Sequence, residues 1–492
     1  MQQFLVTTWV TLVAAGALAA EPGGLPRSTP EEQGISSLAI LSLIEVADRD
    51  VHSLNSFMLV RHGHVVAEGW WAPFSAETPH SLYSLSKSFT STAIGMAVAE
   101  GKISLDDEVL KFFPDLAPAD PSVNLKQMRI RDLLSMSAGH DKEVQLREVK
   151  EQTKAFLAHP VAFKPGTHFL YNTPASYMLS AILQKVNGEK TVDYLRPRLF
   201  EPLGIANPIW EESPEGVTQG GYGLNIRTED IAKFGQLYLQ KGEWNGKQLI
   251  PADWVERATS RQTSNGSNPK SDWDQGYGYQ FWRCRNGCFR GDGAFGQYCI
   301  VMPEQDAVIA ITSGLGDMQS VMNLVWEKLL PALQSGPMSA NTESQEKLKK
   351  TLAGLKLPPQ KGSGAKGAAE KLTGKTFVFP ENEQKLESIA FSEEEGGPTL
   401  TLKCDGKEQR IAIGDGEWRK GQVAYGRFAE QPVAASGGWT ADDIYTAKLC
   451  FYQTPFILTL TLKPRGDDLV YDSEMNVNFG PTKLPQLVGK AK

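Results

Sequence analysis

Ser84 and Lys87 are three residues apart in the stretch YSLSKSFTSTAIGM, residues 83–96, which continues as a run of small and apolar residues. Residues at this spacing share one face of a helix. A serine hydroxyl becomes a nucleophile when a neighbouring group takes its proton. A lysine can be that group if burial lowers its pKa. The pair is therefore a candidate nucleophile and base, although a surface lysine on an ordinary helix has the same spacing.

Tyr171 is a second candidate for proton transfer. It lies in PGTHFLYNTPASYMLSAIL, in a loop directly before a predicted helix. A lysine ammonium close to a phenol favours the phenolate, which could take the serine proton or pass a proton to a leaving group. A packed aromatic side chain is the alternative for Tyr171 taken alone.

A glycine-rich stretch, FRGDGAFGQYCIVM, precedes a predicted strand and offers backbone donors. Glycines such as Gly291 and Gly293 let a backbone approach a ligand closely. One N–H from residues 291–296, together with the Ser84 N–H, could form an oxyanion hole. Arg290 could hold a substrate carboxylate. Arg290-Gly291-Asp292 also spells an integrin-type tripeptide, a signal with little information.

The composition indicates an ordinary globular protein rather than a binder of polyanions. The chain has 492 residues, 41% of them hydrophobic, and a formal net charge of -7 without a long basic run. Its length predicts about two to four domains. Nucleic acid and anionic membrane surfaces are therefore not expected as partners. The sequence leaves the oligomeric state open.

The first twenty residues, MQQFLVTTWVTLVAAGALAA, are apolar and end in small residues. This pattern predicts a signal peptide over residues 1–20 and a secreted or periplasmic protein. No later apolar stretch is long enough for a membrane span.

Export would permit disulfides among the five cysteines. Cys284 and Cys288 could join across a turn, but buried thiols are an equal alternative.

The pattern of helices and strands predicts an α+β fold in three parts. Strand signals occur at both ends of residues 28–335 with helices between them, so the early hairpin should pair with late strands and the middle helices should form a second lobe. Residues 336–370 are polar and rich in Pro, Gly and Lys, as in a linker. Residues 371–492 alternate short strands with turns, as in an all-β domain.

Taken in order, five segments resemble the superfamily of class C β-lactamases, DD-peptidases and serine esterases. They are SLSKSFTSTAIGMAVAEGKISLDDEV, RIRDLLSMSAGH, PGTHFLYNTPASYMLSAI, GGYGLNIRTEDIAKFGQLYL and GAFGQYCIVMPEQDAVIAI. The resemblance implies a β-lactamase/transpeptidase-like antiparallel sheet flanked by helices. It also implies that Ser84 is the nucleophile, Lys87 its base partner and Tyr171 the second proton-transfer group, without a metal or organic cofactor.

Two departures from the superfamily's motifs bear on the substrate. The usual Tyr-x-Asn is here Tyr171-Asn172-Thr173, so either Asn172 or Thr173 would orient the substrate. The usual Lys-Thr-Gly or His-x-Gly before the late strand is missing, and Lys-Thr-Gly occurs nowhere in the chain. This weakens the case for recognition of a β-lactam or D-Ala carboxylate.

We therefore expect a serine hydrolase that forms an acyl-serine on a small ester, amide or peptide substrate, of the esterase, amidase or D-amino-acid peptidase type. A Ser-His-Asp hydrolase is disfavoured because the chain has no G-x-S-x-G elbow. The remaining alternative is a catalytically lapsed relative that binds peptidoglycan or a protein partner.

Overall fold

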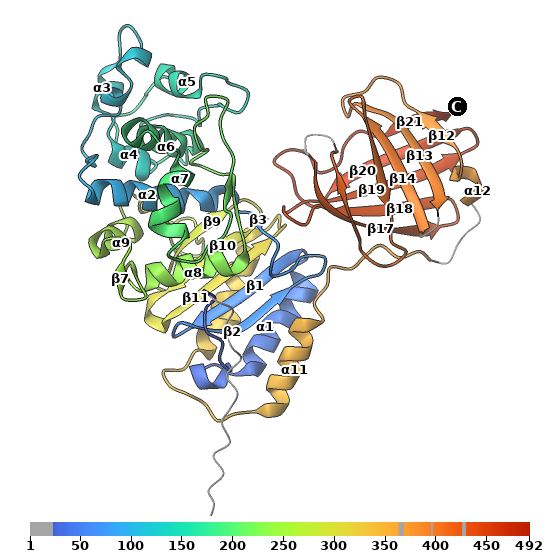
Figure 1. Ribbon diagram of the computed structural model, residues 1–492, viewed down its shortest axis with the longest axis horizontal. Helices are drawn as coiled ribbons and strands as arrows, with labels where there is room; N and C mark the ends of the chain where they lie inside the picture. The colour runs from blue at the N-terminus through green and yellow to red at the C-terminus, as the bar shows by residue number, and fades with distance from the viewer. Residues whose placement is uncertain (1–22, 364–368, 395–396, 426–429) are drawn as a thin grey trace, which may run out of the picture.

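The computed structural model describes residues 23–363, 369–394, 397–425 and 430–492 and has two domains (Figure 1). The expected signal peptide, residues 1–20, lies outside the described residues. Among those residues, no helix combines the length and the apolar composition that crossing a bilayer requires.

A six-stranded antiparallel sheet forms the centre of the first domain. In spatial order its strands are β2 (His64–Trp70), β1 (Leu54–Arg61), β11 (Ala307–Ser313), β10 (Gln297–Met302), β9 (Phe289–Gly293) and β8 (Trp282–Arg283). The register of β1 against β11 runs from Ser56 opposite Thr312 to Arg61 opposite Ala307. The early hairpin therefore pairs with a late strand, as the sequence predicts.

Helices cover both faces of this sheet, because alternate residues of a strand point to opposite sides. Phe57 and Leu59 of β1 enter one core with α1 (Ser37–Asp50), α10 (Met318–Leu324) and α11 (Thr342–Ala353). Met58 and Val60 enter the other core with α8 (Thr228–Leu239). Every residue of β1 is buried because both faces of the sheet are covered, and its central residues 57–60 form a continuous apolar run.

The middle of the chain forms a helical lobe on the α8 side of the sheet (Figure 1). Its helices are α2 (Ser86–Ala99), α3 (Val123–Gln127), α4 (Ile130–Leu134), α5 (Gln152–Ala158), α6 (Thr173–Asn187), α7 (Thr191–Leu195) and α9 (Ala252–Thr259). Two small sheets accompany them. One has the strand order β3 (His80–Ser81), β5 (Leu224–Ile226), β4 (Ile209–Trp210), and the other pairs β6 (Glu243–Trp244) with β7 (Lys247–Gln248). Residues 86–97 of α2 are all buried, so α2 is a central helix, as its small apolar residues predict.

The second domain is a single ten-stranded antiparallel sheet that follows α12 (Ala369–Leu372). Its spatial order is β15 (Lys407–Ala412), β14 (Gly397–Cys404), β13 (Leu386–Glu394), β12 (Thr376–Val378), β21 (Leu487–Ala491), β20 (Asp468–Met475), β19 (Ile457–Arg465), β18 (Ile444–Cys450), β17 (Gln431–Ala441) and β16 (Arg419–Val423). The end strands β15 and β16 are in contact, so the sheet curls into a nearly closed barrel. Alternate residues such as Leu458, Leu460 and Leu462 fill its interior.

The segment expected as a linker, residues 336–370, contains α11, which packs on α1 and β2 of the first domain. The barrel contacts the first domain directly as well. The Ser81 backbone N–H donates to the Gln453 carbonyl at 2.9 Å, and the Asn476 side chain donates to the Gly314 carbonyl at 3.1 Å.

All five cysteines are buried free thiols. Cys284 and Cys288 do lie across a tight turn, where the Cys284 N–H donates to the Cys288 carbonyl at 2.9 Å. Burial raises the pKa of both thiols, to about 11 for Cys284. The alternative of buried thiols therefore describes this structure, and the disulfide does not.

Candidate active site

Ser84 lies in a short 3₁₀ turn, η2 (Tyr83–Leu85), that leads directly into α2. Two contacts with the 224 backbone fix this turn: the Leu82 N–H donates to the Leu224 carbonyl at 2.8 Å, and the Leu224 N–H donates to Ser86 Oγ at 3.1 Å. The hydroxyl of Ser84 therefore lies at the beginning of a central, buried helix.

Lys87 lies one helical turn further on and is 1% exposed. Its Nζ donates to Ser84 Oγ at 3.0 Å, to Thr173 Oγ1 at 3.4 Å and to the Gly221 carbonyl at 2.8 Å. All three acceptors are neutral, so the ammonium form gains no direct carboxylate partner. Burial lowers the pKa of Lys87 from 10.5 to about 7, partly offset by the charges of Glu143 and Asp292. A large share of the lysine is therefore uncharged at neutral pH.

Tyr171 completes a constellation with Ser84 and Lys87. Lys87 Nζ lies 4.9 Å from the centre of the Tyr171 ring, which stacks on Trp282 at 5.3 Å. Burial raises the pKa of Tyr171 above its usual value, Asp292 adds to the rise, and a hydrogen bond with Ser84 opposes it. The phenolate expected from the sequence is therefore disfavoured. The tyrosine is a neutral hydroxyl that can donate a proton and receive one in return.

Thr173 and Asn172, the two residues proposed to orient substrate, have different environments. Thr173 begins α6 and lines the cavity beside Ser84. Asn172 is 1% exposed, and its side chain pairs with His140 Nδ1 at 3.1 Å. Of the two, the structure brings only Thr173 to the cavity, because the Asn172 side chain is buried against His140.

Gly291 and Gly293 bring β9 very close to the nucleophile turn. A Cβ at Gly293 would lie 2.0 Å from the Leu82 carbonyl oxygen and 3.2 Å from the Leu85 nitrogen. A Cβ at Gly291 would lie 2.4 Å from Leu85 Cδ1. Only glycine allows this approach, and it places the next residue, Ala294, in the cavity wall together with Ser84.

Arg290 does not reach the cavity. It is 0% exposed and pairs with Asp292 at 2.8 Å, and it also donates to the Asp272 carbonyl at 2.8 Å. Its guanidinium lies 4.4 Å from the Trp273 ring centre. The expectation that Arg290 holds a substrate carboxylate therefore does not fit, since Asp292 already compensates its charge behind the site. Burial also removes the Arg-Gly-Asp tripeptide from the surface.

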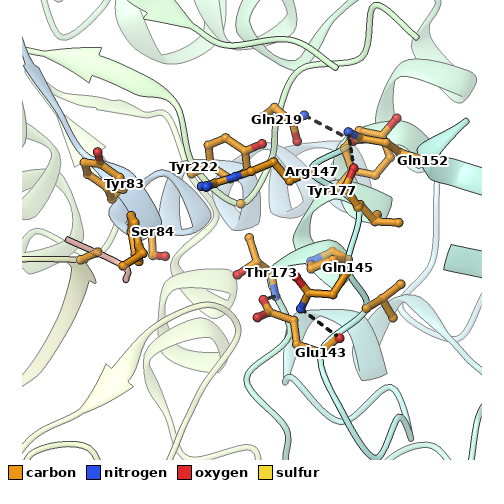
Figure 2. A pocket seen from close by; sticks show the side chains of 16 residues that line it. Tyr83, Ser84, Glu143, Gln145, Arg147, Gln152, Thr173, Tyr177, Gln219 and Tyr222 are labelled. Atoms are coloured by element: carbon orange, nitrogen blue, oxygen red, sulfur yellow. Dashed lines mark hydrogen bonds between the residues drawn. The ribbon is translucent and has the colours of Figure 1, made fainter. Parts of the chain in front are cut away.

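A cavity of about 470 Å³ opens above Ser84 (Figure 2). Figure 2 shows Tyr83 and Ser84 at one side of it and the labelled residues of the helical lobe around the remainder. Its wall combines aromatic and apolar groups with a few polar ones. The lining residues are Tyr83, Ser84, Glu143, Val144, Gln145, Leu146, Arg147, Gln152, Thr173, Pro174, Tyr177, Gln219, Gly221, Tyr222, Ala294 and Phe479.

Several of these residues were not predicted from the sequence. Glu143 accepts a hydrogen bond from the Thr173 N–H at 3.0 Å, and its charge acts on Lys87. Gly221 contributes its carbonyl, and Phe479 comes from the barrel domain. No motif contains Glu143 or Phe479. Gly221 lies in the segment GGYGLNIRTEDIAKFGQLYL, whose resemblance to the superfamily is the one sequence feature that could have indicated it.

Nothing in the described ranges gathers three or more His, Cys, Asp or Glu side chains in a geometry that could hold a metal ion.

Comparison with known proteins gives a consistent result. The Beta-lactamase family model matches residues 46–323, more than half of the chain. The 6-aminohexanoate-dimer hydrolase of Paenarthrobacter ureafaciens is 27% identical over 288 residues, which cover 54% of this chain and 73% of that protein. A beta-lactamase of Escherichia coli K12 is 26% identical over 232 residues, which cover 42% of this chain and 58% of the relative.

Solved structures show the same fold. A penicillin-binding protein homolog from Caulobacter crescentus has a TM-score of 0.51 at 19% identity and covers 62% of this chain and 99% of its own. An octameric penicillin-binding protein homologue from Pyrococcus abyssi has a TM-score of 0.50 at 16% identity and covers 92% of this chain and 99% of its own. The α+β fold expected from the sequence is confirmed, and by the match over residues 46–323 the chain belongs to the beta-lactamase family.

Proposed function

We propose that this protein is a serine hydrolase that cleaves an ester or amide through an acyl-serine intermediate. The observation that carries this proposal is the 3.0 Å contact between Lys87 Nζ and Ser84 Oγ, made by a lysine whose three acceptors are all neutral. A lysine with a pKa of about 7 can take the serine proton at neutral pH.

Acylation proceeds in one proton circuit. Neutral Lys87 accepts the Ser84 proton as Oγ attacks the substrate carbonyl carbon and forms the new C–O bond. The N–H groups of Ser84 and Ala294 stabilise the developing oxyanion. When the tetrahedral intermediate collapses, the bond to the leaving group breaks, and Tyr171 donates its hydroxyl proton to that group. The Lys87 ammonium returns a proton to Tyr171, so both residues end in their starting states.

Deacylation repeats the circuit with water in place of the serine. A water molecule attacks the acyl carbon, and its proton passes to Lys87 through the Tyr171 hydroxyl. The oxyanion forms at the same two N–H groups. Collapse breaks the bond to Ser84 Oγ, which recovers its proton, and releases the carboxylic acid.

The Lys-Thr-Gly segment that would hold a carboxylate next to the scissile bond is missing, and Arg290 is paired with Asp292 behind the site. The charged side chains in the cavity wall are instead Glu143 and Arg147, and Arg147 lies 6.0 Å from the Phe479 ring centre. The relative from Paenarthrobacter is named for hydrolysis of a 6-aminohexanoate dimer, which agrees with amide cleavage. D-amino-acid peptides and β-lactams are therefore weaker candidates.

Covalent labelling tests the proposal. The full chain is incubated with a fluorophosphonate probe, and the labelled peptide is located by mass spectrometry. We expect modification of Ser84, loss of labelling in Ser84→Ala, and none in heat-denatured wild-type protein. Equal labelling of wild type and Ser84→Ala, or none in either, would instead support a catalytically lapsed protein that binds peptidoglycan or a partner.

A substrate panel then assigns the class. p-Nitrophenyl esters, aryl amides, nitrocefin and D-Ala dipeptides are compared by kcat/KM. We expect the esters or amides to be preferred over nitrocefin and the dipeptides.

We also propose that the protein acts outside the cytoplasm, because of the apolar segment 1–20. Amino-terminal sequencing of protein recovered from the periplasm or medium tests this. Recovery of uncleaved chain only in the cytoplasm would refute it.

A further inference from the structure

Two bulky residues beside the proposed oxyanion donors have left-handed backbone conformations. Tyr83, with φ 48°, directly precedes Ser84, and Phe295, with φ 68°, directly follows Ala294. Residues other than glycine rarely adopt this region, and large side chains adopt it least readily. Such conformations persist only where the surroundings hold them. Something outside the two turns must therefore fix Tyr83 and Phe295.

Part of that support comes from the first domain, where the Phe295 carbonyl accepts from the Leu315 N–H and from Ser313 Oγ, each at 2.9 Å. The barrel domain adds to it through an aromatic cluster of Tyr83, Phe295, Phe456 and Phe479. The centre of the Tyr83 ring lies 6.3 Å from the centre of the Phe456 ring and 5.7 Å from that of Phe479. The centre of the Phe295 ring lies 5.6 Å from the centre of the Phe456 ring and 4.7 Å from that of Phe479. Tyr83 and Phe295 also contact each other edge to face at 5.8 Å. Each active-site ring thus packs against both barrel rings, edge to face against Phe456 and tilted against Phe479.

Hydrogen bonds hold the barrel segments that carry these rings. Phe456 is 2% exposed and directly precedes β19. The Asn476 side chain accepts from the Ile457 N–H at 2.7 Å and donates to the carbonyls of Pro455 and Gly314. It therefore ties the segment before β19 to the loop after β20 and both to the first domain.

We propose that the barrel domain is a positioning element of the catalytic site: through Phe456 and Phe479 it holds Tyr83 and Phe295 in their left-handed conformations and so keeps the N–H groups of Ser84 and Ala294 aimed at one point. This inference rests on the proposed acyl-serine function. It gives the barrel a role in the chemical step, whereas a ring that merely lined the cavity would act on substrate binding alone.

Phe479 offers the sharper variant because it is 56% exposed, so its replacement leaves the barrel core intact. Phe479→Leu removes the ring, and Phe479→Tyr retains it. Losing one oxyanion donor outright costs about 10²–10³ in rate, so loosening both turns in Phe479→Leu should lower kcat by roughly 10-fold. Phe479→Tyr restores the ring contacts and should therefore recover most of the kcat that Phe479→Leu loses.

The readout separates positioning from substrate contact. kcat and KM are measured with p-nitrophenyl acetate, butyrate and octanoate. Positioning predicts the same fall in kcat for all three esters, since the oxyanion is common to them. The matched control is Val488→Ala, an exposed barrel residue on β21 that should leave kcat unchanged.

Phe456→Leu provides a second, independent variant, with its melting temperature measured alongside. A folded Phe456→Leu protein should show the same uniform fall in kcat. Unchanged kcat in folded Phe479→Leu, or a fall confined to octanoate or to KM, would overturn the inference. Absence of Ser84 labelling in the wild type would instead refute the proposed function, so the two failures are distinguishable.

Discussion

The titration of Lys87 gives a quantitative test of the proposed base. Burial brings its pKa to about 7, and only the uncharged amine can accept the Ser84 proton. Below this pKa, each pH unit lowers the uncharged fraction by a factor of about ten. The acylation rate should therefore rise with pH through a midpoint near 7 and then level off.

The size of the change follows from the same value. With a pKa of about 7, roughly one lysine in eleven is uncharged at pH 6 and roughly ten in eleven at pH 8. The rate should thus be about 10-fold higher at pH 8 than at pH 6. The buried histidines do not share this window, because burial lowers the pKa of His80 and of His140 to about 4.

Burial sets most of this midpoint, and the charges of two carboxylates in the surroundings move it upward. The charges of Glu143 and Asp292 both raise the pKa of Lys87. Glu143→Gln removes one charge and keeps the oxygen that accepts from the Thr173 N–H. The midpoint should move to lower pH in this variant. Glu148→Gln, an exposed neighbour in the same loop, is the matched control and should leave it unchanged.

The assay is the second-order rate constant for fluorophosphonate labelling between pH 5.5 and 9, with Ser84→Ala measured at each pH to subtract background. A rate independent of pH across this range, or a midpoint above 9, would refute a lysine base with a depressed pKa. If the midpoint is the same in Glu143→Gln and in the wild type, the charge of Glu143 does not contribute to the pKa of Lys87.

Three further outcomes are expected. Tyr171→Phe should lower kcat by about 10²–10⁴ with little change in melting temperature, since the ring still packs on Trp282 and only the transferable proton is lost; unchanged kcat would remove Tyr171 from the circuit. Lys87→Met should be more stable than the wild type below pH 7, where the buried amine carries a charge. The difference in unfolding free energy between the two proteins should narrow between pH 7 and 10.5. In this range Lys87 is protonated in the unfolded chain and neutral in the folded one, so the stability of the wild type rises with pH. The same pH dependence of the melting temperature in both proteins would contradict this. Gly293→Ala should abolish Ser84 labelling, because its Cβ would lie 2.0 Å from the Leu82 carbonyl, whereas Gly421→Ala, which meets nothing within 4 Å, should label normally.

Local patterns in the sequence were sufficient for much of the architecture. Alternating and helical periodicities depend on which residues face a core, so they located the hairpin of β1 and β2, the central helix α2 and the strand-rich C-terminal region. The Ser84–Lys87 spacing also predicted a shared face, and the structure places Nζ 3.0 Å from Oγ. Tyr171 joined them through the resemblance, because nothing local links residue 171 to residue 84.

The sequence could not predict the protonation states of the site residues or which of their side chains extend into the cavity. Arg290 and Asp292 are two residues apart on one strand and face the same side, yet only burial shows that they neutralise each other behind the cavity. The direction in which the pKa of Tyr171 moves likewise depends on how deeply the side chain is buried, which cannot be predicted from the sequence. The sequence by itself determined which residues share a helix or strand face, because that depends on local geometry. Only the tertiary structure decided that Glu143 and a barrel phenylalanine, Phe479, share a wall with Ser84, because such contacts depend on how distant segments pack.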